Sequence, residues 1–205
     1  STKGRYQTLD LDHVGVKAAQ FSFSRLKGAD PRLGVEMAST GEVACFGHNA
    51  EQALLTALMA VGFTVPKKNI LVTIGRLEDK IDMLSSIQAL HERGFKFFAT
   101  KRTHEFLESR NIPSAMLNKV SEPRDPNIRD YLEKKRVDLV INIPTHSRGE
   151  EQTDGYFIRR LATDHGIPLI TNVQLAKRII EALSQENTEQ LPIMEWPKLL
   201  TESTH

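Results

Sequence analysis

The chain has little of three things that would each point to a particular class of protein. Its 205 residues include one cysteine, Cys45, so a disulfide framework is excluded and a reducing compartment fits. Lysine and arginine together number 27, and aspartate and glutamate 26, which leaves no positive excess for general nucleic-acid binding. No run of about 18 apolar residues occurs, and the sequence therefore predicts no membrane-spanning segment.

Familiar catalytic and metal-binding motifs are absent as well. The seven histidines are scattered and show no HExxH or other metal spacing. There is no P-loop, GxSxG or GxGxxG motif, and no pair of carboxylates accompanied by a base. We interpret Asp125, in EPRDPN, as a helix-entry residue, with a catalytic carboxylate as the alternative. The sequence therefore predicts no catalytic residue and no metal site.

From residue 69 onward, short apolar runs alternate with amphipathic stretches. The expected strands are 69–74, 95–100, 114–120, 138–143 and 167–171, and the expected helices are 79–94, 103–111, 127–136, 154–166 and 172–185. Five β–α units predict an α/β fold, a doubly wound five-stranded parallel sheet with helices on both faces. Periodicity does not predict the strand order. Thr103 is the expected N-cap of the second helix, and the first helix is expected to bury Ile81, Leu84, Ile87 and Leu90.

Residues 1–66 do not follow this rhythm and are expected to form an N-terminal α+β appendage. Only GEVACFG (41–47) is typical of a strand, and only HNAEQALLTALMAVG (48–62) is typical of an amphipathic helix. This is too little core for an independent domain, so we expect an excised piece of a larger protein. The second domain is expected to cover 67–205, with a loosely attached polar tail at 186–205.

Polar and basic side chains follow the expected strands at the edge of the sheet where ligands bind. The candidates for this edge are Lys80, Thr100, Thr103, Lys119, Asn142 and Thr145. Hydroxyl, amide and ammonium groups beside a helix N-terminus favour an anion, so the pattern predicts a phosphate site. The alternative is that the two threonines only end a strand and cap a helix, and that each lysine is solvated.

Two segments of the sequence resemble neighbouring parts of one enzyme family. GVKAAQFSFSRLKGADPRLGVEMASTGEVACFG (15–47) resembles the end of the second ATP-grasp half of the carbamoyl-phosphate synthetase large subunit. Residues 69–185 resemble the methylglyoxal-synthase-like allosteric domain that follows it in that family. The resemblance implies a parent ligase that uses ATP and Mg to make carbamoyl phosphate from bicarbonate and glutamine or ammonia. This piece would hold no cofactor and would bind an effector that shifts the synthetase between states.

The resemblance also implies roles for the candidate residues. In similar bacterial enzymes a nucleotide phosphate meets residues that match Lys80, Thr100, Thr103 and Lys119, and an asparagine matches Asn142. After the asparagine, the bacterial sequences continue with threonines, whereas this chain has Ile143 and Pro144. Thr145 is therefore the candidate for the corresponding threonine hydroxyl. A serine of the family is Gly155 here. Leu169 stands where ornithine-responsive enzymes have tyrosine, which argues against an ornithine site.

Several alternatives remain open at this stage. Two lysines at the site favour a phosphorylated effector such as UMP or IMP over the N-acetylglutamate of the ammonia-using relatives. A methylglyoxal synthase has the same fold, but its two catalytic aspartates have no clear counterparts here. A pure docking module is a third reading. The expected partners are the effector, the rest of the synthetase and a glutaminase subunit or domain, with a homo-oligomer left open. The cytoplasm is expected, or the mitochondrial matrix for a urea-cycle type, and arginine and pyrimidine biosynthesis are both open.

Overall fold

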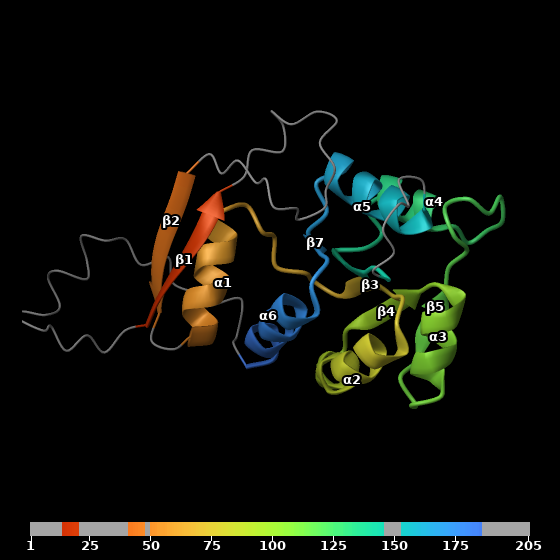
Figure 1. Ribbon diagram of the computed structural model, residues 1–205, viewed down its shortest axis with the longest axis horizontal. Helices are drawn as coiled ribbons and strands as arrows, with labels where there is room; N and C mark the ends of the chain where they lie inside the picture. The colour runs from red at the N-terminus through yellow and green to blue at the C-terminus, as the bar shows by residue number, and fades with distance from the viewer. Residues whose placement is uncertain (1–13, 21–40, 48–49, 146–152, 186–205) are drawn as a thin grey trace, which may run out of the picture.

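The structure contains one parallel α/β sheet and a smaller N-terminal unit beside it (Figure 1). The computed structural model describes residues 14–20, 41–47, 50–145 and 153–185. The expected tail at 186–205 and the side chain of Cys45 lie outside this description. Five strands form the main sheet: β3 (Asn69–Ile74), β4 (Lys96–Ala99), β5 (Ser114–Met116), β6 (Leu139–Ile143) and β7 (Leu169–Ile170).

The five strands are all parallel, as predicted, and their order across the sheet is β5-β4-β3-β6-β7. The chain starts at the central strand β3, runs outward to β5, then returns past β3 to β6. The strand order therefore reverses between β3 and β6, which pair from Ile70 opposite Leu139 to Ile74 opposite Ile143. In open α/β sheets such a reversal opens a crevice at the carboxyl ends of the two strands.

Helices cover both faces of the sheet, which explains the apolar character of the central strands. Figure 1 shows α4 (Ile128–Glu133) and α5 (Asp154–Asp164) above the sheet. It shows α2 (Leu77–Glu92), α3 (Lys101–Glu108) and α6 (Val173–Gln185) below the sheet. Side chains alternate accordingly along β3, because Ile70 and Val72 join the core under α2 and α6 whereas Leu71 packs with α4 and α5.

The helix α2 differs from the prediction in which side chains it buries. Ile81 is 56% exposed, although the sequence predicted it on the inner face. The buried residues are Lys80, Met83, Ile87 and Leu90, whose spacing follows the helical repeat. Lys80 therefore occupies the first position of the buried stripe, one residue before the isoleucine that apolar patterning alone selects.

The N-terminal unit contains one more strand than predicted. β1 (Val14–Gln20) and β2 (Gly41–Gly47) form an antiparallel pair, whereas the sequence predicted only the second strand. β1 carries a thin apolar pattern, and its pairing with β2 supplies the hydrogen bonds that periodicity does not reveal. The helix α1 (Ala50–Ala60) packs against this pair and against α6, so the unit adjoins the main sheet through a helix–helix contact (Figure 1).

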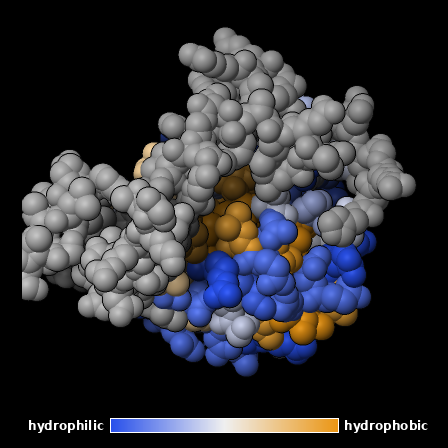
Figure 2. Space-filling model, turned by 60° about the vertical axis from the view of Figure 1, so that its left-hand side comes forward, coloured by the Kyte–Doolittle hydropathy of each residue, from blue (hydrophilic) through white to orange (hydrophobic). Residues whose placement is uncertain are grey.

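The surface mixes polar and apolar areas. The face drawn in Figure 2 has hydrophobic surface at the centre of the described residues and hydrophilic surface below it. The exposed large hydrophobic side chains of the described residues are Met59, Leu77, Ile81, Met116 and Leu175. Among the described helices, none combines the length and apolarity needed to cross a membrane.

We predict that α1 shares a core with the main sheet. Leu55 is fully buried in the same hydrophobic cluster as α6, so Leu55→Ala should lower the free energy of unfolding by about 2–5 kcal/mol in urea denaturation. Met59→Ala, one turn further along and 36% exposed, is the matched control and should cost much less. Equal losses in the two variants would contradict the shared core.

Candidate anion-binding cleft at the carboxyl edge of the sheet

A cleft lies at the carboxyl edge of the sheet, where the strand order reverses. Residues from the ends of β3 and β6 line it, together with the first residues of α3 and α5 and the two residues that precede α6. Of the six residues predicted to bind an effector, five line it: Thr100, Thr103, Lys119, Asn142 and Thr145. The sixth, Lys80, is not among the lining residues.

The helix α3 begins two residues earlier than predicted, and this changes the roles of the two threonines. Thr100, not Thr103, is the N-cap residue, because its carbonyl accepts the N–H groups of Thr103 and His104 at 2.9 Å each. The Thr100 side chain makes no capping hydrogen bond. Lys101 and Arg102 occupy the first turn, where backbone N–H groups have no acceptor inside the helix. The start of α3 therefore presents N–H donors and a threonine hydroxyl to the cleft.

Thr103 has a structural role in this geometry. It is 1% exposed, and its hydroxyl accepts the N–H of Ile74 at 3.2 Å and lies 3.3 Å from the Ile74 carbonyl, to which it can donate. Ile74 is the last residue of β3, so this contact fixes the N-terminus of α3 beside the carboxyl end of the central strand. Thr103 thus lines the cleft, while its hydroxyl is occupied by the backbone.

Lys80 contacts α3 without lining the cleft. Its ammonium donates to the Arg102 carbonyl at 3.0 Å and lies 5.9 Å from the centre of the Phe106 ring. The side chain is 6% exposed. Burial, followed by repulsion from Arg102, lowers the pKa of Lys80, while Glu105 acts in the opposite direction. Lys80 therefore stabilises the first turn of α3 through the Arg102 carbonyl. Its role as a phosphate ligand stays a prediction.

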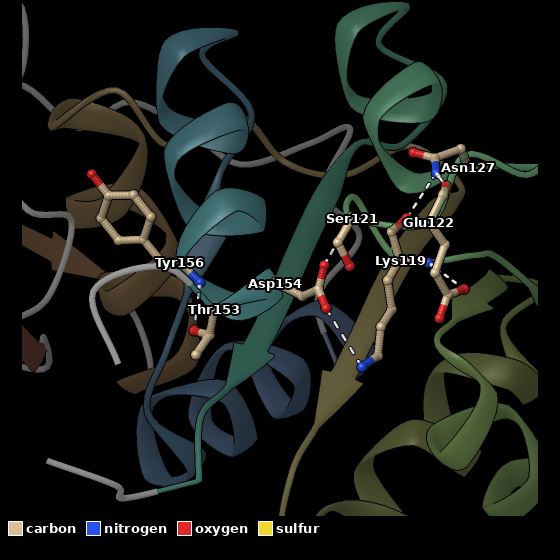
Figure 3. Close-up of polar contacts among 7 residues, drawn as sticks. All are labelled: Lys119, Ser121, Glu122, Asn127, Thr153, Asp154 and Tyr156. Atoms are coloured by element: carbon tan, nitrogen blue, oxygen red, sulfur yellow. Dashed lines mark hydrogen bonds and ion pairs between the residues drawn. The ribbon is translucent and has the colours of Figure 1, made fainter. Parts of the chain in front are cut away.

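Lys119 reaches the cleft from the loop between β5 and α4. Asn127 shapes this loop, since its side-chain amide donates to the carbonyls of Lys119 and Glu122 at 2.7 Å each. Figure 3 shows the Lys119 ammonium directed toward Asp154 at the start of α5, at 3.4 Å. The Asp154 carboxylate also accepts the N–H of Ser121 at 3.0 Å. A carboxylate therefore occupies one side of the ammonium that an anion would approach.

Asn142 is buried at the end of β6, between two partners that the sequence did not indicate. Its amide nitrogen donates to the Thr73 hydroxyl at 2.6 Å, and its amide oxygen accepts from the Arg159 guanidinium at 2.8 Å. Thr73 and Arg159 also line the cleft. An arginine on the inner face of α5, next to the apolar Ile158, was the signal available in the sequence.

Thr145 lies against the end of β3, opposite Gly75. A Cβ atom at Gly75 would come within 2.9 Å of the Thr145 backbone nitrogen, so glycine permits this close approach of the two strand ends. The exposed residue Thr145 thus lines the cleft at the edge of the sheet where the sequence predicted a hydroxyl.

The cleft carries more basic than acidic side chains. The basic residues that line it are Lys101, Arg102, Lys119, Arg124 and Arg159, and the acidic ones are Glu105, Glu122 and Asp154. Within the described ranges, no group of three or more histidine, cysteine, aspartate or glutamate side chains could hold a metal ion. Asp125, the loose candidate for a catalytic carboxylate, does not line the cleft. The arrangement suits a small anion held by hydrogen bonds and lysine or arginine charges.

The lowered pKa of Lys80 predicts how stability changes with pH. Between the lowered pKa and the ordinary value of 10.5, the unfolded chain binds more protons than the folded chain, so the free energy of unfolding rises with pH. The wild type should therefore gain stability relative to Lys80→Met as the pH approaches 10.5. Urea denaturation at a series of pH values measures this, with Lys101→Met as the exposed control. A constant difference between wild type and Lys80→Met would contradict the prediction.

The chain matches known proteins over most of its length. The family model for the MGS-like domain matches residues 82–171. The chain is 47% identical over 191 residues to Multifunctional protein URA2 of Saccharomyces cerevisiae, a match that covers 89% of this chain and 9% of that protein. It is 48% identical over 180 residues to Multifunctional protein pyr-3 of Neurospora crassa, with 84% and 10% covered.

A relative with a more specific name shows similar identity. The chain is 42% identical over 181 residues to the mitochondrial carbamoyl-phosphate synthase (ammonia) of Homo sapiens, a match that covers 86% of this chain and 12% of that protein. The chain thus spans about a tenth of the length of these relatives. The resemblance of the chain to carbamoyl-phosphate synthases and their MGS-like domain is confirmed, whereas the ATP-grasp origin of residues 15–47 stays a prediction. The chain carries an MGS-like domain of the kind associated with carbamoyl-phosphate synthases.

Proposed function

We propose that this chain is the regulatory part of a carbamoyl-phosphate synthase and that its cleft binds a phosphorylated effector, a nucleotide such as UMP or IMP. The proposal rests on one observation, that the first residues of α3 line the cleft. There, the first-turn N–H groups and the Thr100 hydroxyl lie beside a basic lining. A phosphate offers acceptor oxygens and negative charge, which match these donors and the positive end of the helix dipole.

The parent protein would supply the catalytic reaction. Two relatives are named carbamoyl-phosphate synthase, and the match covers only 12% of each. We assign the synthesis of carbamoyl phosphate, with ATP and Mg, to the remainder of such a protein, and ammonia supply to a glutaminase part where glutamine is used. Regulation requires that the effector bind one state of the synthetase better than another.

The helix α6 offers a route from the cleft to the N-terminal unit. Thr171 and Asn172 line the cleft, and the Asn172 side chain accepts the N–H of Leu175 in the first turn of α6 at 3.0 Å. Further along, α6 packs against both α1 and α2. A ligand that shifts the start of α6 would therefore act on the contact with α1, which we place next to the synthetase body.

The phosphate assignment predicts loss of binding when single donors are removed. We expect Thr100→Ala and Lys119→Ala each to weaken a phosphorylated ligand by about 1–3 kcal/mol, the range for charge-assisted hydrogen bonds. Calorimetry with UMP, IMP, UTP, phosphoribosyl pyrophosphate, ornithine and N-acetylglutamate measures the affinities and tests the competing effectors at the same time.

Two matched variants control for general effects on the protein. Thr64→Ala changes an exposed threonine before β3, and Lys96→Ala removes an exposed ammonium at the opposite edge of the sheet. Both should bind as the wild type does. Unchanged affinity in Thr100→Ala and Lys119→Ala would overturn the phosphate assignment, and binding of N-acetylglutamate alone would favour the ammonia-using type.

The contact between Lys119 and Asp154 predicts a variant with higher affinity. An incoming phosphate has to share the Lys119 ammonium with the Asp154 carboxylate, which also repels it. Asp154→Asn should therefore tighten binding by about three- to tenfold, measured by calorimetry. Asp164→Asn, at the far end of the same helix, is the control. Weaker binding by Asp154→Asn would show that the carboxylate helps to hold the ligand.

A further inference from the structure

Three buried polar side chains meet beneath the cleft, and their chemistry permits one direction of hydrogen bonding. Arg159 is 3% exposed, Asn142 4% and Thr73 7%. A guanidinium group carries only donors, so the amide oxygen of Asn142 must face Arg159, at 2.8 Å. The amide nitrogen of Asn142 consequently faces Thr73 and donates to its hydroxyl oxygen at 2.6 Å.

This direction determines what the pair offers to the cleft. The Thr73 hydroxyl already accepts from Asn142, so its own proton points away from Asn142. One N–H of the Asn142 amide is used by Thr73, and the other remains a donor. Both side chains line the cleft. Each side chain can therefore donate one hydrogen bond at the carboxyl ends of the two central strands.

We propose that Arg159 is a positioning residue for anion binding. By occupying the amide oxygen of Asn142, it holds Asn142 and Thr73 in the orientation that donates to the cleft. The inference rests on the proposed function and adds Thr73 and Arg159 to the residues that determine affinity. Without a donor at position 159, the amide can turn so that its oxygen accepts the Thr73 proton. A phosphate oxygen, which accepts hydrogen bonds, would then meet a lone pair.

Gly155 leaves room for this arrangement. It lies in the first turn of α5, and a Cβ atom there would be 3.2 Å from the nearer guanidinium nitrogen of Arg159 and 3.8 Å from the amide nitrogen of Asn142. Both nitrogens thus face the space beside Gly155, which itself lines the cleft. Glycine keeps this space open between the polar floor and an approaching ligand.

A double-mutant cycle in the 205-residue chain tests the proposal. The variants are Thr73→Val, Arg159→Met and the two combined, with UMP and IMP as calorimetric probes. Each single change should weaken binding by about tenfold. The double variant should be weakened little beyond the larger single loss, because Arg159 acts through Asn142 and Thr73. Arg159→Lys keeps a charged donor and should recover part of the affinity. Additive losses, or equal affinity in Arg159→Lys and Arg159→Met, would overturn the proposal.

A second measurement needs no ligand and separates this inference from the proposed function. In nuclear magnetic resonance spectra, the side-chain amide protons of Asn142 should give nuclear Overhauser effects to Thr73 in the wild type but not in Arg159→Met. Should that variant fail to fold, Arg159→Ala serves, since alanine also leaves position 159 without a side-chain donor. Overhauser effects of equal strength in wild type and variant would overturn the positioning role. If the wild type binds neither UMP nor IMP but the spectra of wild type and variant differ as expected, only the proposed function is overturned.

Discussion

The two central strands are covered by helices on both faces, so the polar groups at their carboxyl ends must be satisfied within the fold. Burying such a group without a partner costs several kcal/mol, roughly 2–7 depending on the reference state. Three side-chain contacts meet this requirement: Thr103 with Ile74, and Asn142 with both Thr73 and Arg159. The same contacts fix the start of α3 and the middle of α5 beside the strand ends. The cleft is thus a consequence of how the sheet terminates, and its donors are already oriented by the core.

Much of the fold could be predicted because the central strands and flanking helices have strong periodic patterns. β3 was predicted with the bounds that the structure has, and the remaining strands and helices of the main sheet were placed within a few residues. The order of the strands could not be predicted, since the pattern within a strand does not show which strands lie beside it. β1 was missed because its pairing with β2, far along the chain, stabilises a weakly patterned segment.

The site was predictable in its location and less so in the roles of its residues. Side chains that follow parallel strands meet at one edge, so five of the six candidates do line the cleft. Thr103 and Lys80 illustrate the limit, because both contact the backbone and support α3. Arg159 could not be found from motif spacing, since its importance depends on the distance between α5 and β6. Burial of a charged side chain becomes visible only when the layers are assembled.

The central claim is that a phosphorylated ligand binds at the carboxyl edge of the sheet, at the start of α3. The most direct measurement is a titration of the isotope-labelled chain with UMP and IMP, followed through backbone amide resonances. The account predicts saturable shifts that are largest for Lys101, Arg102 and Thr103, with smaller ones at Gly75 and Gly155. The opposite edge, around Lys96 and Asp138, should be unaffected. Shifts concentrated elsewhere, or none with either nucleotide, would contradict it.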